Sequence, residues 1–362
     1  MKRGSDAARL RSGWVLSPRA DAWMFTGSLA VGLLITLAFA GAGALHAEVP
    51  PWLFVLLVAG VDVAHVYATA FRVYLDPARF QRHSTLYLAV PVLALAAGQV
   101  LHSHDPLTFW RALAYLAVYH FVRQQWGWVA YTRRRAGEGR ADLYLDKAVT
   151  YAATVAPLVW WHASQPREIA WFMEGDFLAL PRAVGVAALL TSALLHAAFA
   201  LQQVRHARSG RGVNWAKVQV VATTSIGWTA AIVVLDSDVA FTALNVLGHG
   251  VPYLAVVWRI EVAAARPSDA ASARLFRPGL RSVALFLGAL AVCGYSEEWL
   301  WHQFVWQEHL EAFPGPFAGD GPSGSLASFL VPLLAVPQAT HYVLDGWLWR
   351  VARNPDLAPL FE

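Results

Sequence analysis

Five histidines and two aspartates lie inside stretches of sequence that are otherwise strongly apolar. They are His65, His120, His196, His249 and His341, with Asp62 and Asp345. An ionisable group at the centre of a bilayer costs at least about 2.5 kcal/mol, so such groups usually face a shared interior. Neutral imidazole suits iron, zinc, copper or nickel, and a carboxylate adds a hard oxygen and negative charge. These seven residues therefore predict a metal site, with each of them as a candidate metal ligand.

Polar neighbours accompany four of the histidines at helical spacing. The groups are Asp62 with His65, His120 with Gln124, Asn245 with His249, and Gln338 and Asp345 with His341. Residues three or four apart share one face of a helix. The amides of Asn245 and Gln338 are therefore expected to hydrogen bond to the imidazoles and to fix the orientation of the rings.

Arg123 lies one helical turn after His120, beside Gln124. A guanidinium group cannot lose its charge in a protein. Within a membrane it needs a carboxylate, here Asp62 or Asp345, or an anionic or carbonyl group of a substrate. Arg123 and Gln124 are therefore candidate catalytic residues.

A single histidine in a membrane span is more often a hydrogen-bond partner of a neighbouring helix than a metal ligand. His196 has the least polar surroundings of the five, with only Ser192 and Gln203 on its face of the helix. The other histidines lie near the ends of the apolar stretches, where solvated surface is expected. These are His46, His83, His102, His104, His162, His206, His302 and His309, and the same expectation applies to Glu297 and Glu298.

Apolar stretches of about 20 residues, long enough to cross a bilayer, must position these side chains. The 362-residue chain is 57% hydrophobic and only 14% charged. The stretches cover residues 22–45, 51–73, 84–101, 108–132, 146–163, 182–205, 215–235, 238–260, 281–299 and 325–351. We therefore predict an all-α fold, a polytopic transmembrane helical bundle of ten spans. Residues 21–352 would form this domain, between tails at 1–20 and 353–362.

Lys and Arg alternate along the chain in a way that supports this count. Of the 28 Lys and Arg residues, 24 lie in the two tails and in every second loop. Because positive residues collect in cytoplasmic loops, both termini are expected to be cytoplasmic, and the location is the cell inner membrane. All five histidines then fall in the cytoplasmic halves of even-numbered spans. The segment 299–324 predicts a short interfacial helix followed by a Gly/Pro loop.

The histidines on separate helices resemble those of the Brp/Blh-type carotene dioxygenases, multi-helix membrane proteins thought to hold iron through such residues. This resemblance implies that His65, His120, His249 and His341 hold non-haem iron. The local motif GHGVPY at 248–253 differs from that family's pattern, and the histidine boxes of membrane desaturases are absent. The segments YHFVRQQWG (119–127) and ATHYVLDGWLWR (339–350) are similar to segments of uncharacterised bacterial multi-pass proteins.

These observations predict an integral-membrane metalloenzyme, an iron-dependent oxidoreductase that uses O₂ and holds one or two non-haem iron ions. The expected partners are the lipid bilayer, a hydrophobic or lipid-like substrate and an electron donor protein, with no nucleic acid. Zinc or another first-row metal could take the same ligands, and zinc would suit hydrolysis of a lipid headgroup. Two further alternatives are a transporter or proton relay that uses His, Asp and Arg without metal, and a bis-His haem b electron carrier.

Overall fold

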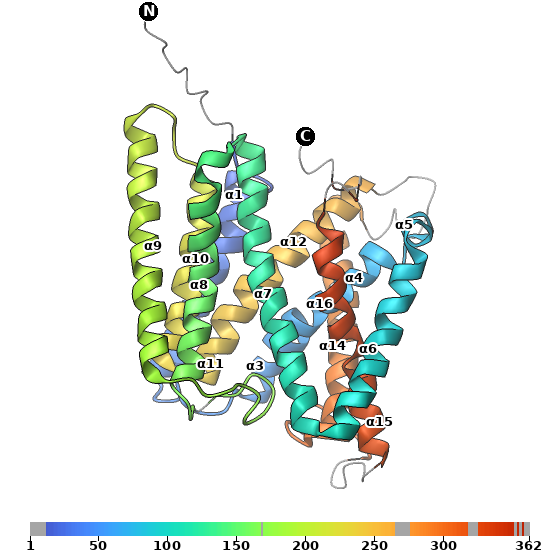
Figure 1. The fold of residues 1–362 in the computed structure, drawn as a ribbon. Helices are drawn as coiled ribbons and strands as arrows, with labels where there is room; N and C mark the ends of the chain where they lie inside the picture. Colours follow the sequence, from blue (N-terminus) through green and yellow to red (C-terminus); the bar gives the residue numbers. More distant parts are fainter. Residues whose placement is uncertain are drawn as a thin grey trace, which may run out of the picture. The chain divides into compact units, whose positions relative to one another are not determined.

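A computed structural model of the chain describes residues 12–167, 169–264, 276–317, 325–350, 353–354 and 357. Within these residues it contains helices, turns and loops but no strand (Figure 1). The predicted all-helical architecture is confirmed for this part of the chain. Each of the ten predicted apolar stretches lies mostly in helix over its described residues, and most helix ends fall within one turn of the predicted ends.

The helices pack into two compact units, each assembled from segments that are distant in sequence. The first unit comprises Met1–Ile35, Phe121–Glu168 and Leu178–Gly248, and the second comprises Thr36–His120, Ile169–Phe177 and His249–Glu362. Three helices, α2 (Ser28–Gly41), α7 (Pro106–Ala136) and α12 (Leu247–Ala264), contribute residues to both units.

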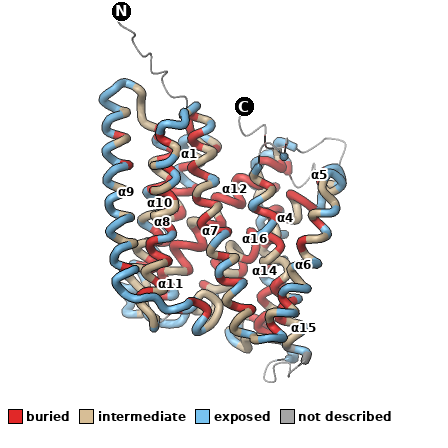
Figure 2. Tube along the Cα trace, viewed as in Figure 1, coloured by how far each residue is buried: buried red, intermediate tan, exposed pale blue. Residues whose placement is uncertain are grey.

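The first unit is built around α8, which packs against α9 and α10. Besides parts of the three shared helices it contains α1 (Pro18–Asp21), η1 (Ala22–Gly27), η3 (Arg140–Asp142), α8 (Leu143–Ala163), α9 (Arg182–Arg208), α10 (Trp215–Trp228), η4 (Thr229–Leu235), α11 (Asp238–Phe241) and η5 (Thr242–Val246). Most of α9 is exposed (Figure 2), including Leu190 and Leu194. An exposed helix of this apolar character is suited to contact with lipid.

A buried group of charges ties α7, α8 and α10 together in this unit. The ammonium group of Lys217, fully removed from solvent, lies 2.8 Å from both Glu138 and Asp146. The guanidinium of Arg133 contacts the same two carboxylates. Because every buried charge here has a partner of opposite sign, we interpret the group as a structural one that holds these helices together.

The second unit holds helices from the middle and from the end of the chain. It contains α3 (Pro51–Leu53), η2 (Phe54–Val63), α4 (Ala64–Val73), α5 (Pro77–Arg82), α6 (Ser84–His104), α14 (Leu280–Trp301), η6 (His302–Trp306), α15 (Ser325–Leu334) and α16 (Val336–Leu348). Helix α14 packs against η2 and α4, and α16 packs against α6 and α4. At Gly294 a side-chain carbon would overlap the carbonyl oxygen of Ala59, so this close approach of α14 to η2 requires glycine.

Among the residues that the structure describes, seven helical stretches are long and apolar enough to cross a membrane. They are Pro18–Gly41, Pro51–Val73, Ser84–His104, Arg182–Arg208, Trp215–Leu235, Asp238–Ala264 and Leu280–Trp306. The other three predicted spans correspond to α7, to α8 and to the pair α15–α16. The described helices thus have the number and composition of a multi-pass membrane protein.

Two predicted segments differ from the structure in detail. The stretch 325–351 is divided by a turn at Ala335, one residue before α16 begins, with Pro337 in the first turn of that helix. Proline lacks the backbone N–H that would continue a helix from the preceding turn. The start of the segment 299–324 is not a separate interfacial helix, because α14 continues into η6, where His302 and Gln303 are buried.

Candidate metal centre

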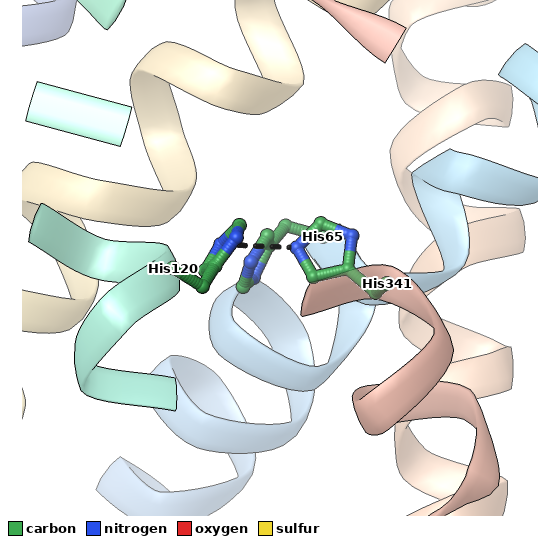
Figure 3. A group of neighbouring side chains, drawn as sticks. All are labelled: His65, His120 and His341. Atoms are coloured by element: carbon green, nitrogen blue, oxygen red, sulfur yellow. Dashed lines mark hydrogen bonds between the residues drawn. The ribbon is translucent and has the colours of Figure 1, made fainter. Parts of the chain in front are cut away.

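Four histidines of the second unit bring their rings together from four different helices. His65 is on α4, His120 on α7, His249 on α12 and His341 on α16. Each residue is only 1% or 2% exposed. We call these four side chains the tetra-histidine centre. The predicted convergence of these rings is confirmed, and Figure 3 shows three of them pointing toward one another.

The rings meet through their Nε2 atoms. The distance between Nε2 atoms is 3.0 Å from His65 to His249, 3.3 Å from His249 to His120, and 3.2 Å from His120 to His341. Imidazole nitrogens bound at about 2.0–2.1 Å to one ion stand about 2.9–3.4 Å apart in square or tetrahedral geometry. The observed separations therefore fit ligands that share a single ion.

Hydrogen bonds between the rings cannot satisfy all three contacts. A neutral imidazole has one N–H and one nitrogen lone pair, so each Nε2 carries either a hydrogen or a lone pair. The Nε2 atoms of His249 and His120 each contact two other rings. At least one of the three contacts must then have no hydrogen atom between its two nitrogens to form a hydrogen bond. A cation, in contrast, could accept the lone pairs of all four Nε2 atoms.

Polar groups lie near Nδ1 of three of the rings, and the one beside His341 is within hydrogen-bonding distance. The Nδ1 atom of His120 is 3.5 Å from a carboxylate oxygen of Asp345, and that of His65 is 3.6 Å from Asp62. Nδ1 of His341 is 2.7 Å from the hydroxyl oxygen of Thr69. Metal-binding histidines usually have such a partner at the second nitrogen, which fixes the tautomer and the ring orientation.

Asp62 and Asp345 thus lie beside the centre as predicted, but in different settings. Asp345 is buried, with hydrogen bonds from the indole of Trp349 and the hydroxyl of Tyr253. Asp62 is partly exposed. One of its carboxylate oxygens lies within 4.8 Å of a ring nitrogen of His65 and of a ring nitrogen of His249, and these two nitrogens lie within the same distance of each other. Asp62 is therefore the aspartate with the better access to a metal.

Hydroxyl and aromatic groups complete the surroundings of the centre. The hydroxyl of Tyr253 is 3.3 Å from that of Thr69, and its ring lies 5.5 Å from His65. The ring of Tyr342 lies 5.1 Å from His120. Sequence reasoning missed these three residues, although Thr69 follows His65 by one helical turn and Tyr253 follows His249 by one turn.

A glycine allows α12 to approach η2 at this level. A side-chain carbon on Gly250 would come within 2.7 Å of Val61 Cγ1 and 3.3 Å of its carbonyl oxygen, whereas one on Gly248 would meet nothing within 4 Å. The close approach brings α12, which carries His249, against the segment that leads into His65. Of the two glycines that flank His249, Gly250 is the one required for packing.

His196 is not part of this group, although it was a candidate ligand. It lies on α9 in the first unit, and both of its ring nitrogens are engaged there. Nε2 is 2.6 Å from the hydroxyl of Ser225, and Nδ1 is 2.7 Å from the carbonyl oxygen of Ser192. This is the ordinary arrangement of a histidine that links two helices.

The remaining predicted site residues have other surroundings. In the first unit, Arg123 donates a 2.8 Å hydrogen bond to the hydroxyl of Tyr151 rather than to an aspartate. Gln124 and Asn245 are buried in the same unit, and Asn245 lines a small cavity there. In the second unit the amide of Gln338 donates to Glu297, at 3.1 Å, and not to a ring of the centre.

Three residues expected to be solvated at the end of α14 are in fact buried. Glu297, Glu298 and His302 are 3%, 5% and 1% exposed. The carboxylate of Glu297 accepts hydrogen bonds from Tyr67 at 2.6 Å, and from Gln338 and Trp301. These partners come from other turns and helices, and so adjacent sequence could not reveal them. His102, also expected to be solvated, is 7% exposed.

Two carboxylates outside the predicted spans have local hydrogen-bond partners. Asp105, at the end of α6, accepts hydrogen bonds from the hydroxyl and the N–H of Thr108, which lower the pKa of its carboxyl group. Asp176 lies in the segment before α9, and burial raises its pKa against the opposing effect of N–H donors from Phe172 and Met173. Both are local turn interactions, and neither points to chemistry.

Comparisons of the chain with known protein families, with curated proteins and with solved structures find no match.

Proposed function

We propose that the protein is an integral-membrane metalloprotein in which His65, His120, His249 and His341 bind one first-row transition metal ion. The observation that carries this proposal is the set of three Nε2–Nε2 contacts of 3.0–3.3 Å among four buried rings. Four neutral nitrogens suit such an ion, and the carboxylates of Asp62 and Asp345 could balance a charge of +2.

Iron is the metal that we propose, in an oxidoreductase that uses O₂. Four nitrogen ligands close the tetrahedral shell that zinc prefers in structural sites. The same four ligands on an octahedral ion leave two positions open, as non-haem iron oxygenases require. When bound, the ion would supply the site for O₂, while the chain holds the rings in place through Asp345, Thr69 and Asp62.

The proposed substrate is apolar or lipid-like. Helices rich in apolar side chains surround the centre, and Tyr253 and Tyr342 present aromatic rings to it. A membrane-dissolved substrate could therefore approach without passing through water. An electron donor protein would be required if the reaction consumes more electrons than the substrate provides.

In the proposed topology, the chain crosses the cell inner membrane ten times, and both termini lie in the cytoplasm. The ten helical stretches and the alternation of Lys and Arg between loops support it. It would place the tetra-histidine centre in the cytoplasmic half of the bundle.

A metal-free proton relay is the second candidate, because the same row of ring contacts could conduct protons. A bis-His haem is less suited to this geometry. A porphyrin would have to lie between two imidazoles, whereas neighbouring Nε2 atoms here are only 3.0–3.3 Å apart. The relay and the metalloprotein differ in one observable property, which is the presence of a bound metal.

Elemental analysis of protein purified in detergent tests the proposal. We expect about one first-row metal ion per chain, with no intense haem absorption. His65→Ala, His120→Ala, His249→Ala and His341→Ala should each lose most of the metal. His196→Ala is the matched control, since it removes an intramembrane histidine from the first unit, and it should retain the metal. Purified wild-type protein that contains no bound first-row metal would contradict the metalloprotein and favour the relay.

A further inference from the structure

A small cavity inside the first unit has a polar wall built from three elements. Its volume is about 20 Å³. The polar wall consists of Asn245 from η5, Gln125 from α7, and Thr223 and Thr224 from α10. The remaining described lining residues are aromatic, aliphatic or glycine, so none of the residues described around the cavity is charged. We call this space the Asn245 cavity.

The side-chain amide of Asn245 is the polar group of this wall that needs a ligand. Neither its Oδ1 nor its Nδ2 has a hydrogen-bond partner among the described residues. The residue is nevertheless only 3% exposed. Buried polar groups are nearly always hydrogen bonded, and each one that is not carries a free-energy cost. A partner for this amide therefore has to come from the cavity that it lines.

The two threonines of the wall already use their hydroxyl hydrogens within the protein. The hydroxyl of Thr224 donates to Oε1 of Gln125 at 2.9 Å. The hydroxyl of Thr223 donates to the backbone carbonyl oxygen of Gln219, also at 2.9 Å. A hydroxyl group has one hydrogen and two lone pairs, so both oxygens can still accept a hydrogen bond but cannot donate one to Asn245. A ligand that suits this wall must therefore both donate and accept.

The size and the neutrality of the cavity restrict this ligand further. One water molecule needs a cavity volume of roughly 10–15 Å³, so about 20 Å³ holds one or two of them. An ion would need an opposite charge or a full set of ligands to replace its hydration, and the described lining offers no charge. Water is neutral, donates and accepts, and typically forms about three hydrogen bonds when it is buried.

We propose that the Asn245 cavity binds one or two ordered water molecules, which hydrogen bond to the amide of Asn245 and to oxygens of the polar wall. The water links η5 to α7 and α10, three elements of the first unit. This role replaces the one expected from the sequence, in which Asn245 orients an imidazole. The proposal does not depend on the metal centre, because all of its residues belong to the first unit.

A high-resolution density map of the full-length protein in detergent tests the proposal directly. We expect an isolated peak about 2.7–3.2 Å from the amide of Asn245 in the wild type. The map of Asn245→Leu should lack this peak, because leucine is similar in size but offers no hydrogen bond. An empty cavity in a wild-type map that shows other buried waters would overturn the proposal. Density that continues from the peak along a chain would also overturn it, since the ligand would then be the hydroxyl group of a lipid or detergent.

A cavity-filling substitution provides a second, independent test. A side-chain carbon on Gly227 would lie 3.8 Å from Cδ1 of Leu29 and 4.0 Å from the carbonyl oxygen of Leu244. Both residues line the cavity, so alanine enters it without a collision. In a dry cavity the methyl group would fill empty space and stabilise the protein, whereas in a hydrated cavity it displaces water and leaves the amide of Asn245 without a partner.

Gly288→Ala is the matched control for Gly227→Ala. Gly288 is an exposed residue within α14, and a side-chain carbon there would meet nothing within 4 Å, so only the helix propensity changes. We expect Gly227→Ala to unfold a few degrees below Gly288→Ala in detergent, because the loss of a buried hydrogen bond offsets the gain in propensity. An unfolding temperature of Gly227→Ala equal to or above that of Gly288→Ala would indicate a dry cavity and contradict the proposal.

Discussion

At the residue scale, Asp345 has the best-defined role among the side chains that support the rings. It lies beside Nδ1 of His120 and is itself held by Trp349 and Tyr253. Asp345→Asn removes the negative charge that favours a hydrogen on Nδ1 and a lone pair on Nε2. We expect metal affinity to fall about 10–100-fold, as for other partners of metal-bound histidines.

Competition with a chelator of known affinity measures this change in Asp345→Asn. The matched control is Asp76→Asn in the same unit. Asp76 caps α5 by accepting hydrogen bonds from the N–H groups of Ala78 and Arg79, and asparagine can cap equally well. Equal affinities for the two variants would show that Asp345 does not support the centre.

The four converging histidines could be predicted from sequence because an ionisable group stands out in an apolar stretch. Their partners could not be predicted equally well. Thr69 and Tyr253 resemble ordinary residues of a membrane helix, and their significance depends on which helix they face. His196 illustrates the opposite error. It lies in an apolar stretch like the other four, although with fewer polar neighbours, and its nitrogens are occupied by Ser225 and Ser192.

At the scale of elements, Gly250 determines how closely α12 can approach η2. In Gly250→Ala the new methyl group would collide with Val61, and overpacking of this kind costs about 1–3 kcal/mol. Because α12 carries His249, we expect Gly250→Ala to lower the metal content per folded chain as well as the unfolding temperature. Elemental analysis beside thermal unfolding in detergent measures both effects.

Gly248→Ala is the control for this substitution, two residues away on the same helix. A methyl group there meets nothing within 4 Å, and alanine favours a helix over glycine. It should retain metal and stability. Loss of metal in Gly248→Ala alone would show that the approach of α12 to η2 is not what positions His249.

The buried charges of the first unit give a second prediction at this scale. Lys217→Met leaves Glu138 and Asp146 with only Arg133 as a buried cationic partner among the contacts described above. Breaking a buried ion pair typically costs about 3–5 kcal/mol. Thermal unfolding in detergent should therefore show a clear loss of stability, whereas metal content per folded chain should not change. An unaltered unfolding temperature would contradict the structural role of this group.

The helices themselves were largely predictable, because hydropathy and length are local properties of the sequence. The turn at Ala335 and the continuation of α14 into η6 were missed, since both depend on packing against other segments. The burial of Glu297 and Glu298 was missed for the same reason. A carboxylate near the end of a span looks identical in sequence whether it faces water or the interior of the protein.

At the scale of the whole molecule, the proposed topology can be tested independently of any metal. Reporter fusions at Arg140 and Arg208 should read as cytoplasmic, and fusions at Asp236 and Gly319 as external, because Lys and Arg collect on the cytoplasmic side. A single fusion on the wrong side would require a different number of spans. The division into two compact units was not evident from sequence, since each unit draws on distant segments.

The coordination of the bound metal tests the central claim most directly. An X-ray absorption spectrum at the edge of the metal that co-purifies with the protein reports which atoms bind it and at what distance. We expect about four imidazole nitrogens at about 2.1 Å, and a loss of this signal in His120→Ala and His249→Ala. A spectrum dominated by sulfur or by oxygen ligands alone, or one that is unchanged in these variants, would contradict a metal bound by the tetra-histidine centre.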